Sequence, residues 1–512
     1  MTNSRGNFFL LSMFYLVAHG GILLIPNAIY WDDWILYRVD PEIILNTFKQ
    51  AGSMFNVGGF LHKAMLDVGP WIYKVLTFWL MFASGILLNS ILKRYENIAT
   101  ETRFFIVLLF LLLPFNLARV ALIDFPYTLC YFLFFLAWQL MDRFRIAALA
   151  LFFLSFNTNS LLVIYALPVL DMLYRSGHLA SLKSALGFGI RRIDYLLLPF
   201  VYFFVKFYFF APSGLYEGYN QSYSTQNLME SAILQRDDFF HLFKLLREVV
   251  GVELWLFLSL FVFLFVKNKP LIATPQKWIS WGLLAIGLLA FFLGAFPYWI
   301  LGYVPTFNDW SSRHQLLLPL GSALIIVGIL SFNNLNGKTK AHSIIIRGSQ
   351  TINASVISII VGASLAFNVS SYATLFIDWQ KQKQLIHLFS KNADLERAGL
   401  VVFVDATEQL NGLGRKQRSY EWNGMLEAAF GNQKRFAIQQ SQSDDYLSGN
   451  LDRYFQSEYK AGSFRKNVGL PSVLVEINLA KPGNFREKIM NSVFTKLTLS
   501  VSEIDLTNSR KQ

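Results

Sequence analysis

Long apolar runs separated by short polar stretches occupy the first three quarters of the chain. The hydrocarbon core of a bilayer is crossed by about 20 predominantly apolar helical residues, so runs of about this length predict membrane helices. The sequence predicts such helices at residues 8–30, 71–92, 104–122, 125–141, 194–211, 250–266, 278–300, 315–332 and 351–372. We therefore expect residues 1–378 to form an all-α polytopic membrane bundle.

The apolar stretch at 146–174 is interrupted by polar residues at 157–160. Non-helical backbone at membrane depth must be buried in protein or must line a wet cavity. We expect two short helices here, which either cross the membrane or turn back within it. Counted as two crossings, they bring the expected number of membrane segments to about 11.

Two polar connections, 41–66 and 228–249, carry regularly spaced apolar residues. Helices with one apolar face lie along the membrane surface, with that face towards the lipid. We expect both connections to form such helices, the first of them broken at Gly58 and Gly59. Together they could roof a cavity that opens to both lipid and water.

Beyond residue 378 charged and polar residues become common. The run 400–405 predicts a buried strand, and 472–479 and 495–501 alternate as strands do. Residues 422–430 predict a helix that ends at Gly431. We therefore expect residues 379–512 to be a small α/β domain outside the membrane.

The distribution of charged residues predicts how the chain is oriented in the membrane. The net charge of +12 would suggest nucleic acid in a soluble protein, but only 15% of these residues are charged and 54% are hydrophobic. Lys and Arg number 15 in the 59 residues of the proposed inner connections and 8 in the 100 residues of the outer ones. Because positive residues gather on the cytoplasmic side, we expect a plasma (inner) membrane protein with a cytoplasmic N-terminus and an extracytoplasmic C-terminal domain, and no nucleic-acid partner.

An acidic aromatic motif, Tyr30-Trp31-Asp32-Asp33-Trp34, follows the first predicted helix on the outer side. Aromatic residues commonly anchor helices at this depth. Carboxylates near hydrocarbon are costly and tend to be functional, and one in a partly desolvated cavity can act as a general base. The acid pair could also simply end the helix in water.

This motif resembles the GT-C class of integral membrane glycosyltransferases, which take a sugar from a polyprenyl-phosphate carrier. The resemblance covers the layout of about residues 1–375 and is specific around 30–34. It implies that Asp32 and Asp33 supply the catalytic base or its neighbour. The connection 41–66 is similar to the surface helices of that class, and the break at 157–160 to its short, interrupted membrane helices.

A phosphate-bearing lipid donor would need cations on the same face, and Arg is the best bidentate phosphate ligand. The candidate phosphate-binding residues are Arg38, Arg119, Arg313 and His314. The candidate residues for binding the sugar or the acceptor are Trp34, Asp309, Trp310, Glu217 and Tyr219. Lys206, within an apolar run, is a further intramembrane cation that either extends to the surface or marks a site.

We therefore predict an inverting glycosyltransferase that moves a sugar from a polyprenyl-phosphate donor to a surface polysaccharide or a lipid-linked glycan. The chain has no phosphate-binding P-loop and no His-Glu-x-x-His, which argues against nucleotide hydrolysis and against a zinc peptidase. No cofactor is predicted with certainty, although the acid pair could hold a divalent metal. An O-antigen or capsule polymerase and a non-enzymatic polysaccharide or lipid transporter remain as alternatives.

Overall fold

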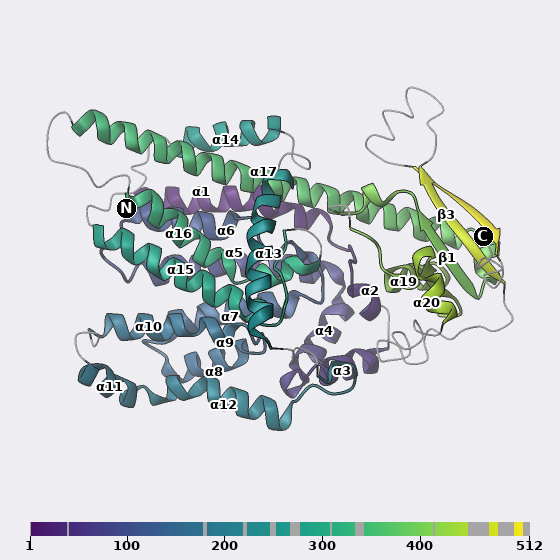
Figure 1. Ribbon diagram of the computed structural model, residues 1–512, viewed down its shortest axis with the longest axis horizontal. Helices are drawn as coiled ribbons and strands as arrows, with labels where there is room; N and C mark the ends of the chain where they lie inside the picture. Colours follow the sequence, from purple (N-terminus) through teal and green to yellow (C-terminus); the bar gives the residue numbers. More distant parts are fainter. Residues whose placement is uncertain are drawn as a thin grey trace.

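The computed structural model describes residues 2–37, 40–177, 182–218, 223–245, 252–266, 277–307, 310–332, 342–412, 415–448, 471–479 and 496–504. Helices make up the larger, N-terminal part of this structure, and a small sheet with its own helices lies at one end (Figure 1). The bundle helices are α1 (Thr2–His19), α5 (Pro70–Leu92), α6 (Thr100–Leu112), α7 (Phe125–Leu140), α8 (Arg145–Ser155), α9 (Leu161–Ile164), α10 (Ala166–Arg175), α11 (Leu182–Arg191), α12 (Ile193–Phe209), α14 (Val252–Val266), α15 (Lys277–Trp299), α16 (Leu318–Phe332) and the first part of α17 (His342–Ser390).

The described helices are compatible with a membrane protein. Those long and apolar enough to cross a bilayer cover Arg5–Leu24, Pro70–Leu92, Trp278–Trp299 and Thr351–Ser390. Shorter apolar helices cover Phe125–Leu140, Arg145–Ser155, Val252–Val266 and Leu318–Phe332. The expected total of about 11 crossings stays a prediction, because the remaining segments are too short or too polar to be assigned by length and composition.

Two predicted helices end earlier than expected, and a proline follows each of them in the sequence. The helix expected over 104–122 ends at Leu112, because the residue before Pro114 is disfavoured in the α conformation. Asn116 then takes a left-handed φ of 57°, and a short 3-10 helix follows at Leu117–Val120. The helix expected over 8–30 becomes a 3-10 helix at Gly20–Leu24, just before Pro26. Both early ends free backbone that forms part of the candidate site.

The connection between α1 and α5 holds three short helices, α2 (Asp33–Leu36), α3 (Pro41–Gln50) and α4 (Val57–Val68). The expected break at Gly58 and Gly59 was wrong, because both lie in the first turn of α4 and the chain turns at 51–56 instead. Phe55 and Asn56 take positive φ values of 52° and 51° there. Gly58 instead allows close packing, since a Cβ atom on it would lie 2.8 Å from the Phe48 ring.

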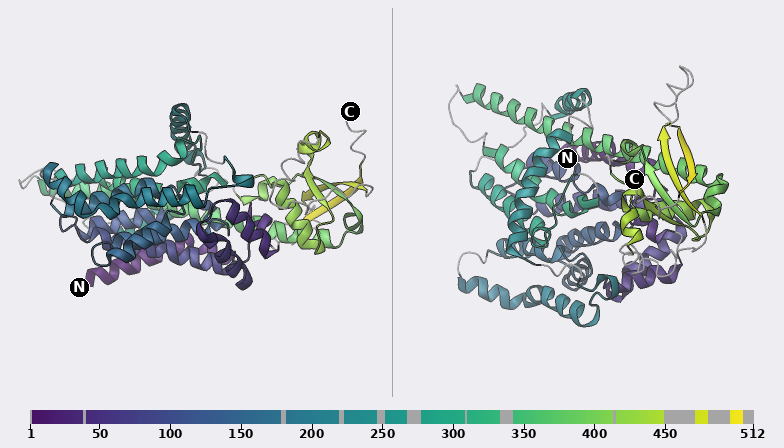
Figure 2. Two further views of the ribbon diagram at one scale, coloured as in Figure 1. Left: turned by 90° about the horizontal axis from the view of Figure 1, so that it is seen from below. Right: turned by 45° about the vertical axis from the view of Figure 1, so that its right-hand side comes forward.

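The second amphipathic connection forms α13 (Thr225–Leu245). In Figure 1 this helix runs across the bundle helices rather than along them, and in Figure 2 it projects from one side of the bundle. A helix that lies in the plane of a membrane would take such a direction relative to membrane-crossing helices.

The C-terminal domain is carried on the end of α17, which leaves the bundle and continues into it (Figures 1 and 2). Its other elements are α18 (Ala393–Arg397), β1 (Leu400–Asp405), α19 (Ser419–Phe430), β2 (Phe436–Gln439), α20 (Ser443–Leu447), β3 (Ser472–Leu479) and β4 (Leu497–Glu503). The strand order is β2-β1-β3-β4, with β1 parallel to both neighbours and β4 antiparallel to β3. The small C-terminal sheet is therefore confirmed, although the four-residue strand β2 had not been predicted.

One continuous core joins this domain to the bundle. Phe403 of β1 stacks on Trp422 of α19 with 4.4 Å between ring centroids, and Phe389 of α17 packs on Phe403 at 5.4 Å. The same buried cluster includes Trp34 of α2 and Phe125 of α7. The boundary expected between 378 and 379 falls inside α17, so the two parts share a helix as well as a core.

Candidate functional site

The Asp33 side chain binds both the segment that follows α1 and the segment that follows α6. Its Oδ2 accepts hydrogen bonds from the Tyr30 and Leu122 amides at 3.3 and 2.8 Å, and its Oδ1 accepts one from the Ile123 amide at 2.9 Å. Burial raises the pKa of Asp33 above its usual range, while Lys74 and the three amides act in the opposite direction. Both carboxylate oxygens are thus engaged by backbone, and Asp33 is better suited to holding the site together than to accepting a proton from substrate.

Asp32 stands in a different environment from its neighbour. It precedes the first turn of α2 and is only partly buried, so it can meet a substrate. Its carboxylate faces Tyr420 of the C-terminal domain, and burial together with the Asp32 charge raises the pKa of that tyrosine. Tyr420 packs in a small cluster with Ile35, Leu36 and Ile44 of α2 and α3, which fixes it against the acidic motif.

Asp124 adds a third carboxylate, which was not among the predicted site residues. It precedes α7 and is buried, and neither carboxylate oxygen has a hydrogen-bond partner among the described residues. Burial raises its pKa well above the usual range, Arg313 opposes that rise, and the charges of Asp33 and Asp32 add to it. Asp124 is therefore within range of the charges of the acidic motif and of Arg313.

Trp310 and Arg313 lie in a short 3-10 helix, Trp310–Gln315, before α16. The Arg313 guanidinium lies 4.3 Å from the Trp310 ring centroid, and the Trp310 ring lies 5.5 Å from that of Trp31. The Arg313 Nη1 is buried without a hydrogen-bond partner in the described part of the chain. The acidic motif and the Trp310–Arg313 stretch, which lie far apart in the sequence, therefore meet at one place.

Hydrogen bonds from backbone amides to side chains join the segment after α6 to the 310–315 helix. Ser312 Oγ accepts the amide of Ala118 at 2.9 Å, and Gln315 Oε1 accepts the amide of Asn116 at 3.2 Å. The segment freed by the early end of α6 thus binds the 310–315 helix through its first residues and Asp33 through its last ones. Asp124 follows directly after the residues that Asp33 holds.

Two predicted phosphate ligands do not fit that role. His314 is buried between the rings of Tyr298 and Tyr303, at 4.9 and 5.1 Å, and burial followed by the Arg313 charge lowers its pKa to about 3. A neutral imidazole cannot supply a positive charge. Arg119 is buried with its Nη2 atom 2.6 Å from His19 Nδ1, so it faces the end of α1 instead of the acidic motif.

Two of the predicted sugar- or acceptor-binding residues, Trp34 and Glu217, do not fit that role either. Trp34 is buried and its Nε1 donates to Gln382 Oε1 at 3.0 Å, so its ring serves packing instead of ligand contact. Glu217 is exposed beside a 3-10 turn at Gly214–Tyr216, and no described hydrogen bond or ion pair joins it to the acidic motif. The predictions at Arg38, Asp309 and Tyr219 lie outside the described residues.

A buried ion network behind the motif had not been predicted. Arg415 donates to Asp378 at 2.8 Å and to both oxygens of Glu421 at 2.7 and 2.6 Å, and all three side chains are inaccessible to solvent. Its guanidinium also lies 5.3 Å from the Trp31 ring centroid. The C-terminal domain therefore braces the acidic motif directly. Because Arg415 and Trp31 lie far apart in the sequence, local sequence patterns carry no signal for this contact.

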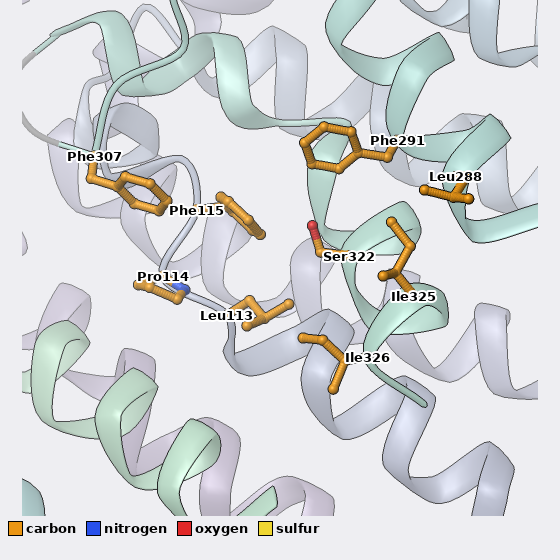
Figure 3. A pocket seen from close by; sticks show the side chains of 9 residues that line it. All are labelled: Leu113, Pro114, Phe115, Leu288, Phe291, Phe307, Ser322, Ile325 and Ile326. Carbon is orange, nitrogen blue, oxygen red and sulfur yellow. The ribbon is translucent and has the colours of Figure 1, made fainter. Parts of the chain in front are cut away.

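An apolar cavity of about 380 Å³ lies between α15, α16 and the segment after α6 (Figure 3). Its lining includes Leu113, Phe115, Leu288 and Ile325, and Ser322 supplies a hydroxyl. At one end Phe307 stacks on Phe115 with 5.6 Å between ring centroids. Asn116, directly after Phe115, is hydrogen-bonded to Gln315 of the short helix that carries Arg313.

Among the described residues no group of three His, Cys, Asp or Glu side chains is placed to hold a metal ion. Comparison of the chain with protein-family models, with curated proteins and with solved structures found no match. The site itself is therefore the basis for assigning a function.

Proposed function

We propose that the chain is a membrane glycosyltransferase that moves a sugar from a polyprenyl-phosphate donor to a surface polysaccharide or lipid-linked glycan. The observation that carries this proposal is the convergence of Asp32, Asp124 and Arg313 beside the Trp31–Trp310 pair, at the end of an apolar bundle. In the orientation that the Lys and Arg distribution favours, this end faces away from the cytoplasm.

Asp32 is assigned the role of general base. A base must reach the hydroxyl that it deprotonates, and Asp32 is the acid of the pair with an accessible side chain. The acceptor hydroxyl loses its proton to Asp32 and attacks the anomeric carbon, while the bond from that carbon to the phosphate oxygen breaks. Attack from the face opposite the phosphate inverts the anomeric configuration.

Arg313 is assigned to the leaving phosphate. Its buried Nη1 has no described partner, and a guanidinium in a water-poor site stabilises the charge that develops on a departing phosphate. Asp124 has a raised pKa and stays protonated more readily than an ordinary aspartate. As a neutral acid it can donate a hydrogen bond to a phosphate oxygen without repelling the phosphate.

The surrounding apolar surfaces suit the rest of such a donor. The cavity shown in Figure 3 is wide enough for part of a hydrocarbon chain and begins beside the Phe115–Phe307 pair. A prenyl chain lying there would bring its phosphate towards Arg313. The Trp31 and Trp310 rings can cover the apolar face of a sugar.

The surface glycan of cells provides a test. The chromosomal copy is deleted, and the wild-type chain, Asp32→Asn or the control Asp67→Asn is supplied in its place. Asp67 is an exposed carboxylate at the end of α4. We expect mass spectrometry to show one sugar missing from the glycan with Asp32→Asn and present with Asp67→Asn. If cells with Asp32→Asn make a complete glycan at matched protein levels, the proposed function is wrong.

A further inference from the structure

A second cavity, separate from that of Figure 3, lies under the short helices α3 and α4. Its volume is about 270 Å³, and its walls come from α3, α4, α7, α8 and α12. None of the residues used for the proposed donor site lines it. Its lining divides into a polar end and an apolar side, which is the pattern that an amphiphile requires.

Lys206 supplies a positive charge at the polar end. It lies in the last turn of α12 and donates a hydrogen bond to the carbonyl oxygen of Gly52. An ammonium has three N–H donors, so this contact leaves two for a ligand as far as the described residues go. No acidic side chain appears in the described lining, and Lys206 has no described ion pair.

Neutral polar groups stand beside Lys206. Ser53 follows Gly52 directly, and its Oγ accepts the amide of Gly58 at 3.0 Å. Asn157, from the polar break between α8 and α9, accepts the Met54 amide through Oδ1 at 3.4 Å. These bonds bring the turn at 51–56 and the polar residues at 157–160 to the same end of the cavity. The Ser53 hydroxyl and the Asn157 amide therefore lie at the same end as the Lys206 ammonium.

The rest of the lining is mostly apolar, and part of it belongs to helices of the bundle. Leu129 and Leu133 come from α7 and Leu154 from α8. Cys130, the protein's one cysteine, lines the cavity between these residues and the polar end, because the Leu154 carbonyl oxygen that lies 3.8 Å from its Sγ also accepts a hydrogen bond from Asn157 Nδ2 at 3.0 Å. Such a wall offers the first carbons of a hydrocarbon chain an environment like that of the bilayer.

We propose that this cavity binds the phosphate head group of a membrane lipid, with the phosphate at Lys206 and the start of the chain along α7. A single ammonium with neutral hydrogen-bonding groups suits a phosphate, since Lys binds phosphate as a point charge. The apolar wall restricts the ligand to one that carries a chain. This site does not depend on the proposed transfer reaction.

Cys130 allows binding to be measured in the native chain. The purified protein in detergent is treated with N-ethylmaleimide, and the alkylation of Cys130 is followed by mass spectrometry. Phosphatidylglycerol, an isoprenyl phosphate or diacylglycerol, which lacks phosphate, is added first. We expect one or both phosphate lipids to slow alkylation by about tenfold or more at saturation, and diacylglycerol to have no effect, because only the phosphate lipids gain the charged contact. Protection by phosphatidylglycerol assigns the site to bulk lipid, and protection by isoprenyl phosphate alone assigns it to a polyprenyl lipid.

Substitutions test the Lys206 charge and the space in the cavity independently. Lys206→Ala should weaken protection by about tenfold or more in lipid concentration, whereas Lys206→Arg should keep it. Lys49→Ala changes an exposed lysine on α3 and is the matched control, expected to behave as wild type. Leu133→Trp should block the cavity while leaving the charge in place. Equal protection by diacylglycerol, protection by none of the lipids, or full protection in Lys206→Ala would overturn the proposal.

Discussion

Asp32 and Asp33 are neighbours in the chain, but their carboxylates stand in different environments. Asp33 is buried with both oxygens accepting backbone amides, whereas Asp32 is partly exposed beside Tyr420. The sequence predicted that this acid pair includes the catalytic base, but it could not show which of the two acids has that role. The division depends on the amides of Leu122 and Ile123, which are far from the motif in sequence.

The assignment of Asp32 as base and Asp124 as a neutral donor predicts unequal effects of the same substitution. Asp32→Asn removes the proton acceptor and should lower kcat by about 10²–10⁴-fold. Asp124→Asn keeps an N–H donor and should lower kcat by about tenfold or less, as expected for one altered hydrogen bond. Initial rates at saturating donor measure both. Equal losses in the two variants would contradict the division of roles.

His314 should make stability depend on pH. Its pKa is lowered to about 3 in the folded protein, so the unfolded chain binds a proton more readily between about pH 6.5 and 3. Its stabilising contribution is therefore complete above about pH 6.5 and falls as the pH falls, by at most about 1.4 kcal/mol per pH unit. We expect His314→Gln to show a smaller drop in Tm between pH 7 and pH 5 than the wild type in detergent. An unchanged pH dependence would mean that His314 is not buried neutral.

At the scale of elements, several of the described helices follow the predicted apolar runs closely. α5, α7, α14 and α15 begin and end within two residues of the predicted bounds. The predictions fail at the end of α6 and at the turn between α3 and α4, where Pro114, Phe55 and Asn56 set the backbone. These exceptions matter, because the chain between α6 and α7 holds the candidate site together.

Gly424 provides a test of the contact between α19 and α2. Alanine in place of glycine in a helix usually stabilises a protein by about 1 kcal/mol. A Cβ atom on Gly424 would lie 2.7 Å from Cε3 of Trp34, so overpacking of about 1–3 kcal/mol should exceed that gain. We expect Gly424→Ala to lower the Tm and to reduce activity through the displaced motif.

Gly282→Ala is the matched control for this substitution. Gly282 lies within α15, and a Cβ atom there would meet no other atom within 4 Å. It should leave the Tm unchanged or raise it. A Gly424→Ala variant as stable as the Gly282→Ala variant would show that α19 does not pack against Trp34 in this way.

At the scale of the whole molecule, the C-terminal domain is part of the candidate site rather than an appendage. Its presence and its strands β1 and β3 could be predicted from alternating and buried apolar runs. Its docking could not, because Arg415, which pairs with Asp378 and Glu421, meets the distant Trp31 ring only in the folded chain. The same holds for Tyr420, which carries no local signal of a role.

Removing Arg415 should loosen this docking. Arg415→Met leaves Asp378 and Glu421 buried without their counter-charge, which typically destabilises a protein by about 3–5 kcal/mol. We expect faster hydrogen exchange in α19 and in the acidic motif together. As a control, Arg397→Met changes an exposed ion pair on α18 and should leave both regions as in the wild type. Faster exchange in α19 alone would mean that the domain does not brace the motif.

The central claim is that Asp32 promotes sugar transfer from a lipid phosphate. Membranes of the deletion strain, which contain the acceptor, are supplied with purified protein and with radiolabelled glucose or mannose on polyprenyl phosphate. Incorporation of label into glycan is then measured. We predict that the wild-type chain incorporates one of these sugars and that Asp32→Asn does so about 10²–10⁴-fold more slowly, while Asp67→Asn matches the wild type. Wild-type incorporation by Asp32→Asn, or incorporation from nucleotide sugars alone, would contradict the claim.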